Sequence, residues 1–263
     1  SSPHVAFLNL ASSDVTDGEF LVATIAIVGG VGVTITPPAG WTLVRRVDNA
    51  GSVSVAVYYR FAQTEPATWS WLLSTSALHG GLIRVYTGVD RFYAVDVEGG
   101  NEVATSVNHP IPSLTTAIDG AYLIGSFAAA STGTYTMPSG WTRRPGLHHA
   151  TMAVAGADGG LGPKGATGGA TAVFSANVAA ATHVLALRPS VGKLTDDEVY
   201  DVLVSLLPPG ATDLYDLDNT GSNIRKLFDA LADSYKAQAF DYMDLLRLEL
   251  FPQSATLKLP EWE

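Results

Sequence analysis

The sequence predicts a mainly β protein, an antiparallel, jelly-roll-like β-sandwich followed by a small α-helical docking segment. From Val5 to Leu187, short apolar or alternating runs are separated by Gly, Pro, Asn and Asp, which is the pattern of strands and turns. This part has no convincing helical periodicity, which favours antiparallel sheets over βαβ units. After residue 194 apolar residues recur at helical spacing. We therefore expect a β domain at 1–189, a linker at 190–194 and a helical segment at 195–263.

The most regular strand-like runs lie within the first 189 residues. They are EFLVATIAI (19–27), SVSVAVYYRF (52–61), TWSWLL (68–73), GLIRVY (81–86), AYLIGSF (121–127) and HVLALR (183–188). Their number and spacing are typical of a two-sheet fold.

The β part also repeats its own plan. DGEFLVATIAI followed by TPPAGWT, at 17–27 and 36–42, is matched by DGAYLIGSFAA followed by TMPSGWT, at 119–129 and 136–142. Each half alone would supply only a few strands and half a core, so we expect one pseudo-symmetric sandwich. The Pro and Gly of each second motif predict a turn that folds Trp41 or Trp141 back onto a sheet.

Two helices are expected in the last part of the chain. A capping box at Thr195 and Glu198 opens a short helix over 195–206, which the prolines of LLPPG end. A second helix is expected at 222–251. At ~1.5 Å per residue it would be roughly 40 Å long, more than the short helix can cover. Its apolar stripe therefore predicts a partner protein.

Charge is spread unevenly along the 263 residues. Residues 1–189 carry 9 basic and 11 acidic side chains and residues 190–263 carry 6 and 14, so the net charge of −10 divides into −2 and −8. Nucleic acid requires a basic face, so it is not an expected partner. No apolar run approaches the ~20 residues of a membrane helix, so no membrane insertion is expected. The absence of cysteine excludes disulfides and thiolate zinc sites.

The acidic turn SLLPPGATDLYDLDNTGSN (205–223) aligns in part with a calcium-binding EF-hand loop. With Asp216 at its first position, the twelfth position falls on Leu227, where the loop needs a bidentate glutamate. We therefore interpret the turn as a connector in which Asp218, Asn219 or Ser222 caps the following helix. No metal or cofactor is expected.

Catalytic patterns are weak. GLGPKG (160–165) matches the dinucleotide-binding string but runs into a strand and not a helix. His148 and His149 are adjacent, so a strand would point them to opposite faces. Asp96 and Glu98 share one strand face and raise the hypothesis of a glycan-cleaving enzyme, although solvated carboxylates are the commoner case. We expect no enzyme activity and assign no catalytic residue.

Aromatic residues suggest a different role. Trp69 and Trp71 share one strand face, where two indoles either stack on sugar rings or, more often in a sandwich, fill the core. Together with Phe92 and Tyr93 they are the candidate glycan contacts.

Residues 1–189 resemble a β-sandwich domain found in tailed-phage proteins and bacterial extracellular proteins. The resemblance lies in TPPAGWTLVRRV, in the run from VAVYYRF to VYTGVD, in DGAYLIGSFAAAS, in MPSGWTRR and in VLALRPS. It implies an adhesive or architectural module without catalytic residues.

Residues 195–263 resemble the start of the YmfQ/Mu-like phage tail and baseplate protein family. The matching features are LTDDEVYDVLVSLLPPG, the long run from NIRKLF to FPQSA, and TLKLPEWE. Here the element follows a β domain, so the resemblance implies the docking part of that family's role.

The leading functional hypothesis is a structural component of a phage tail or baseplate, located in the virion and assembled in the host cytoplasm. Its expected partners are other tail or baseplate proteins, with multiple copies in the assembly. Docking is expected through apolar and proline positions of the helical segment, namely Leu206, Leu207, Pro208, Pro209, Ile224, Leu227, Phe228, Leu231, Tyr235, Tyr242, Leu246 and Trp262. The alternative is a glycan-binding adhesin or receptor-binding protein that contacts host surface polysaccharide, and a glycan-cleaving enzyme ranks last.

Overall fold

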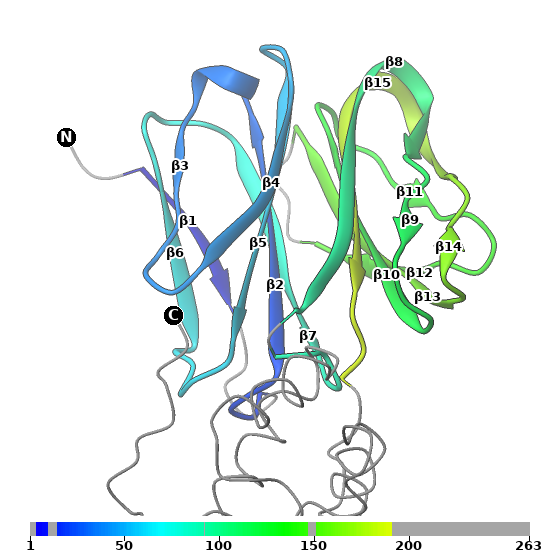
Figure 1. Ribbon diagram of the computed structural model, residues 1–263. Coiled ribbons are helices and arrows are strands. Elements are labelled where there is room, and N and C mark those ends of the chain that lie inside the picture. Colours follow the sequence, from blue (N-terminus) through cyan, green and yellow to red (C-terminus); the bar gives the residue numbers. More distant parts are fainter. Residues whose placement is uncertain (1–3, 10–14, 92, 147–150, 191–263) are drawn as a thin grey trace, which may run out of the picture. The chain divides into compact units, whose positions relative to one another are not determined.

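The computed structural model describes residues 4–9, 15–91, 93–146 and 151–190 (Figure 1). This part is mainly β, with antiparallel strand pairs and, among the residues described, one short 3-10 helix at Gly30–Gly32. The mainly β prediction is confirmed for it. The linker beyond Ser190 and the predicted helical segment at 195–263 lie outside the described residues.

The first repeat consists of two antiparallel sheets. The larger has the order β4 (Thr42–Asn49), β5 (Val53–Phe61), β2 (Phe20–Val28) and β7 (His79–Tyr86). The smaller has the order β1 (His4–Asn9), β6 (Thr68–Leu73) and β3 (Ile35–Thr36). A buried cluster that includes Leu21, Ile25 and Trp71 joins them. It forms because alternate residues of β2 and β6 point to the same side of their strands.

The second repeat has the same strand order. Its main sheet runs β12 (Thr142–Pro145), β13 (Ala153–Gly162), β10 (Ala121–Ala129) and β15 (Ala170–Leu187). Three short strands complete the repeat, namely β9 (Thr115–Thr116), β11 (Tyr135–Thr136) and β14 (Gly165–Ala166). The long strand β8 (Val95–Ile111) pairs with β15 over its length. In Figure 1 this pair forms a tall ribbon that bends over at the top of the green-to-yellow half.

Strand β15 takes the positions that two separate strands, β6 and β7, occupy in the first repeat. Its first part pairs with β11 at Phe174, as β6 pairs with β3 at Leu73. Its second part pairs with β10, as β7 pairs with β2. The repeat noticed in the sequence is therefore a repeat of the whole pairing plan.

The two repeats pack through the outer faces of their main sheets. Two further buried clusters contain residues of both repeats, one around Val55 and Val154 and the other around Phe20 and Leu185. Between these clusters the hydroxyls of Thr24 and Ser126, which occupy matching positions of β2 and β10, lie 2.8 Å apart.

Each half of the β part is more complete than the sequence predicts. We expected half a core from each repeat, but each encloses a buried cluster of its own in addition to the shared ones. The reason is the second layer, because β1, β6 and β3 in one repeat, and β11 with the adjoining parts of β8 and β15 in the other, cover the inner face of the main sheet.

Both predicted turns are confirmed. The backbone N–H of Trp41 donates to the carbonyl of Pro38 at 3.4 Å, and that of Trp141 donates to Pro138 at 3.1 Å. The preceding glycines have φ values of +84° and +83°, a conformation in which other residues are strained. Trp41 is buried, whereas Trp141 is only partly buried.

Candidate functional site

The candidate glycan contacts divide between core and surface. Trp71 is fully buried in the first repeat, and Trp69 is partly buried with its ring edge-on to Trp41 at 5.7 Å. Phe92 lies outside the described residues. Tyr93 is 44% exposed and lies under the guanidinium of Arg188, 5.7 Å from its ring centre. The core interpretation holds for Trp71, which cannot reach a glycan in this fold, and Tyr93 is the described candidate that solvent reaches most freely.

The paired carboxylates of β8 are held by other groups. Asp96 accepts from the backbone N–H of Ala117 at 2.8 Å and from Arg188 Nε at 3.3 Å, and its side chain is 2% exposed. Glu98 accepts from Arg45 Nε and Nη2 at 2.5 and 2.7 Å. Both carboxylates therefore belong to ion pairs that join strands.

The environment of Glu98 disfavours the role of a general acid. The hydrogen bond from His183 and the charge of Arg45 lower the pKa of Glu98 to about 2, against the opposing effect of burial. A glycosidase acid needs a raised pKa. Burial lowers the pKa of His183, so its neutral ring donates from Nε2 to Glu98 at 3.1 Å. The arrangement is a buried polar link between β8 and β15.

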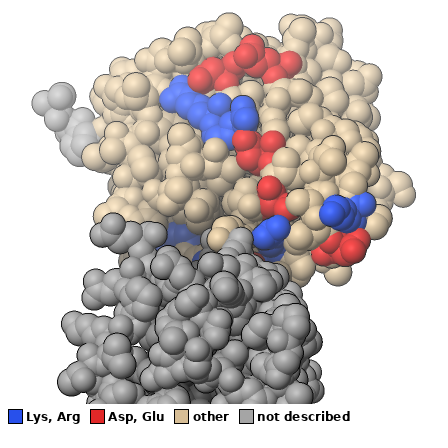
Figure 2. All heavy atoms as spheres, in the orientation of Figure 1, with Lys and Arg blue, Asp and Glu red and all other residues tan. Residues whose placement is uncertain are grey.

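Surface charges of the β part occur in mixed groups. In Figure 2 red and blue side chains adjoin one another on a mostly tan face. The ion pairs include Arg46–Asp48 at 2.7 Å and Arg45–Glu98 at 2.5 Å. Mixed pairs of this kind give no extended basic face for a phosphate backbone.

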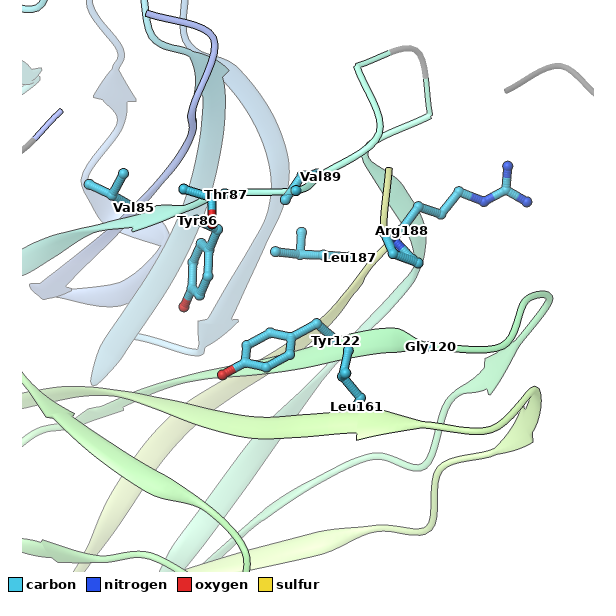
Figure 3. A pocket seen from close by; sticks show the side chains of 11 residues that line it. Val85, Tyr86, Thr87, Val89, Gly120, Tyr122, Leu161, Leu187 and Arg188 are labelled. Carbon is cyan, nitrogen blue, oxygen red and sulfur yellow. The ribbon is translucent and has the colours of Figure 1, made fainter. Parts of the chain in front are cut away.

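A pocket of about 310 Å³ lies between the two repeats, and we name it the seam pocket (Figure 3). Its lining comprises the end of β7 and the following loop, the start of β10, Leu161 of β13 and the end of β15. The rings of Tyr86 and Tyr122, with centres 5.9 Å apart, come from different repeats. In Figure 3 the guanidinium of Arg188 points away from them. The pocket is an apolar recess edged by tyrosine hydroxyls.

A buried carboxylate supports this pocket. Asp158 Oδ1 accepts from the hydroxyl of Tyr86 at 2.7 Å, and Oδ2 accepts from Arg144 Nε at 2.5 Å. The buried guanidinium of Arg84 lies 3.9 Å away. Burial raises the pKa of Tyr86, so its hydroxyl stays protonated and donates to Asp158. The group links the repeats and leaves no nucleophile poised for reaction.

The glycine-rich motif GLGPKG lies between strands and not at the start of a helix. GLGPKG spans the end of β13, a turn and the first residue of β14, and the segment after it continues into β15 and not into a helix. Without a helix N-terminus the pyrophosphate of a dinucleotide has no binding partner. His148 and His149, the acidic turn at 205–223 and all the predicted docking residues from Leu206 to Trp262 lie outside the described residues.

Within the described ranges, no group of three or more His, Asp or Glu side chains is arranged to hold a metal ion. The same ranges contain no helix with the length and apolar character needed to cross a membrane. Comparisons of the chain with protein-family models, with curated proteins and with solved structures found no match.

Proposed function

We propose that the protein is a structural component of a phage tail or baseplate. In this proposal residues 195–263 form the helices that dock into the assembly, and the β part, a jelly-roll-like module, projects outward and contacts the host surface. The protein is located in the virion, is assembled in the host cytoplasm and is present in multiple copies. Other tail or baseplate proteins are its partners.

The observation that carries the proposal is the division of the chain into two unlike parts. The β part has two repeats that share buried clusters, and its charged residues near the candidate catalytic pair are engaged in ion pairs. The last part holds −8 of the net charge and an apolar stripe at helical spacing. A packed β module attached to a segment that needs a partner suits an assembly component.

Deletion of residues 190–263 tests the docking role. The deletion should abolish incorporation into particles, measured by immunoblotting of purified virions. A sharper variant is Leu227→Asp with Phe228→Asp, which places charge on the apolar stripe. Its matched control is Asp233→Ala, about half a helical turn around from the stripe. Normal incorporation of the truncated protein or of the double variant into particles would contradict the proposal.

The adhesin alternative concerns the β part alone and is compatible with docking. Enzyme activity is the weakest candidate because Asp96 and Glu98 are both paired with guanidinium groups. Replacing them by Asn and Gln should leave any polysaccharide depolymerisation by particles unchanged, and a loss above tenfold would revive the enzyme hypothesis.

A further inference from the structure

The two repeats can be matched residue by residue around their Trp turns. Ala62 and Gly162 accept equivalent backbone hydrogen bonds from Gly18 and Gly120, both at 2.9 Å. Two residues later, the backbone N–H groups of Thr64 and Lys164 donate to Asp17 and Asp119. This register pairs position 60 with 160 and position 65 with 165. The matching pairs of β3 with β6 and of β11 with β15 likewise pair position 69 with 170.

In the first repeat the side chains of Arg60, Glu65 and Trp69 contact one another, and Trp69 packs against Trp41. The indole of Trp69 meets the ring of Trp41 at 87° and donates from Nε1 to Glu65 at 3.0 Å. The guanidinium of Arg60 lies over Trp69 at 4.7 Å and pairs with Glu65 at 3.2 Å. The side chains of Arg60 and Glu65 are only 12% and 2% exposed. The site beside this turn is therefore filled by the chain itself.

In the second repeat the three matching positions are Gly160, Gly165 and Ala170. A Cβ atom built on either glycine would meet no atom within 4 Å, so this space is open. A pocket of about 210 Å³ lies beside Gly160 and Ala170, lined by Thr116, Ala121, Leu123, Trp141 and residues 159–163 and 166–170. We name it the Trp141 pocket. Its lining includes Gly160 and Ala170, the counterparts of Arg60 and Trp69 in the first repeat.

The lining defines the chemistry of an occupant. None of the residues around the Trp141 pocket carries a charged side chain, so a neutral ligand avoids the cost of burying an unpaired charge. The volume is below the about 300–1,000 Å³ of sites for drug-sized ligands, which suits a single ring. An indole offers an apolar surface, and the surrounding backbone N–H and C=O groups suit ring hydroxyls. A sugar ring combines an apolar face with a hydroxyl rim.

We propose that the Trp141 pocket binds a neutral saccharide ring stacked on Trp141. The ligand is a hexose-type residue of a surface polysaccharide. The first repeat has no such site because its own side chains occupy the equivalent space. The inference rests on the host-contacting part of the proposed function and is independent of docking by residues 195–263, so the two can fail separately.

The test is binding of the full chain to an array of neutral and anionic bacterial polysaccharide fragments, followed by calorimetry with the fragments that bind. Ala170→Trp restores the indole of the first repeat and should weaken binding of neutral fragments at least tenfold. Trp141→Ala should do the same, whereas Trp141→Phe should retain part of the affinity. Near-ultraviolet circular dichroism checks the fold of each variant.

Two control variants test whether the loss of binding is specific to the Trp141 pocket. Ala67→Trp adds an indole at an exposed position of the first repeat and should leave binding unchanged. Tyr93→Ala removes the exposed aromatic suggested by the sequence and should also leave it unchanged. The proposal is overturned if no neutral fragment binds, if only anionic fragments bind, if binding survives Ala170→Trp, or if it is lost in Tyr93→Ala. Should Ala170→Trp not fold, equal binding by Trp141→Ala and Trp141→Phe would overturn it. Particle incorporation is measured separately and reports only on docking.

Discussion

The two repeats share a backbone plan and fill it with different side chains. The strand order, the glycines of the Trp turns and the backbone hydrogen bonds near them recur. The positions that carry the large core side chains differ between the repeats. In the first repeat Ala6 lies opposite Trp71, and in the second His109 lies opposite Ala172 at the matching pair. The large residue has moved to the facing strand. Cores tolerate such exchanges when the total volume is kept.

The exchange extends to neighbouring positions. The second repeat places Phe127, Tyr135 and Phe174 where the first has Ile25, Ile35 and Leu73. The rings of Tyr135 and Phe174 lie 4.7 Å apart. At these matched positions the first repeat places the indole of Trp71 beside aliphatic residues, and the second places a group of smaller rings.

Trp71→Ala should have the largest effect, because nothing else in the first repeat fills the space. A loss of about 3–5 kcal/mol in unfolding free energy is expected for a fully buried tryptophan, measured by urea unfolding. Ala6→Phe in the same chain places bulk on the facing strand, as the second repeat does, and should recover part of the loss. A loss below about 1 kcal/mol for Trp71→Ala would contradict this account of the core.

Arg84 marks a second difference between the repeats, at the contact between them. Its guanidinium donates to the Gly125 carbonyl at 2.9 Å and to the Ser126 hydroxyl at 2.9 Å, and the matching residue of β15 is Leu185. Arg84→Ala should cost about 3–5 kcal/mol, because it leaves buried polar groups without partners. Arg84→Leu should cost less, since leucine fills more of the volume. Equal losses would show that filling the volume contributes little.

Acid should weaken the second repeat selectively. Among the histidines that the structure describes, the two that are fully buried, His109 and His183, belong to it, and burial lowers the pKa of each. Below about pH 6.5 the unfolded chain then binds protons that the folded chain refuses. Stability should therefore fall with decreasing pH, by at most about 1.4 kcal/mol per pH unit for each histidine.

The measurement is urea unfolding between pH 7.5 and 5, with His183→Leu as the comparison, because leucine occupies the matching position 82. The variant should show a smaller pH dependence. Glu98 adds a separate loss at lower pH. Its folded pKa of about 2 lies below the ordinary value of 4.5, so its stabilisation disappears as the pH falls from about 4.5 towards 2. An unchanged profile in His183→Leu would show that His109 or other groups dominate.

The sequence predicted the features that depend on local pattern. All six apolar runs are strands or parts of strands, because a half-buried strand alternates its side chains. Of strand β8 only the start, with Asp96 and Glu98 on one strand face, was predicted. The rest of VDVEGGNEVATSVNHPI was missed, since it is mostly polar and only the pairing with β15 defines it. HVLALR was recognised as a strand, but the 18-residue length of β15 was not.

The candidate sites were harder to predict than the strands, because they depend on which residues of neighbouring strands are paired. TWSW at 68–71 attracted attention through its indoles, yet Trp71 is core and Trp69 is held by Arg60 and Glu65. The informative signal was the matched stretch GATA at 169–172, where both indoles are replaced by alanine. That match becomes visible only when the pairing of β11 with β15 is known. A pocket that forms because small residues replace large ones has no sequence motif that would identify it.

The turn glycines should give the smallest effects and the most direct comparison between repeats. Gly40→Ala and Gly140→Ala each force a residue with a Cβ into the left-handed region, at a cost of about 1–2 kcal/mol. The new Cβ of Gly40→Ala would also lie 3.1 Å from Arg60 Nη1, whereas that of Gly140→Ala would meet nothing within 4 Å. Gly40→Ala should therefore be the more destabilising variant in thermal unfolding. Equal losses would show that Arg60 moves aside easily, and a larger loss for Gly140→Ala would contradict the assignment of an open space beside Trp141.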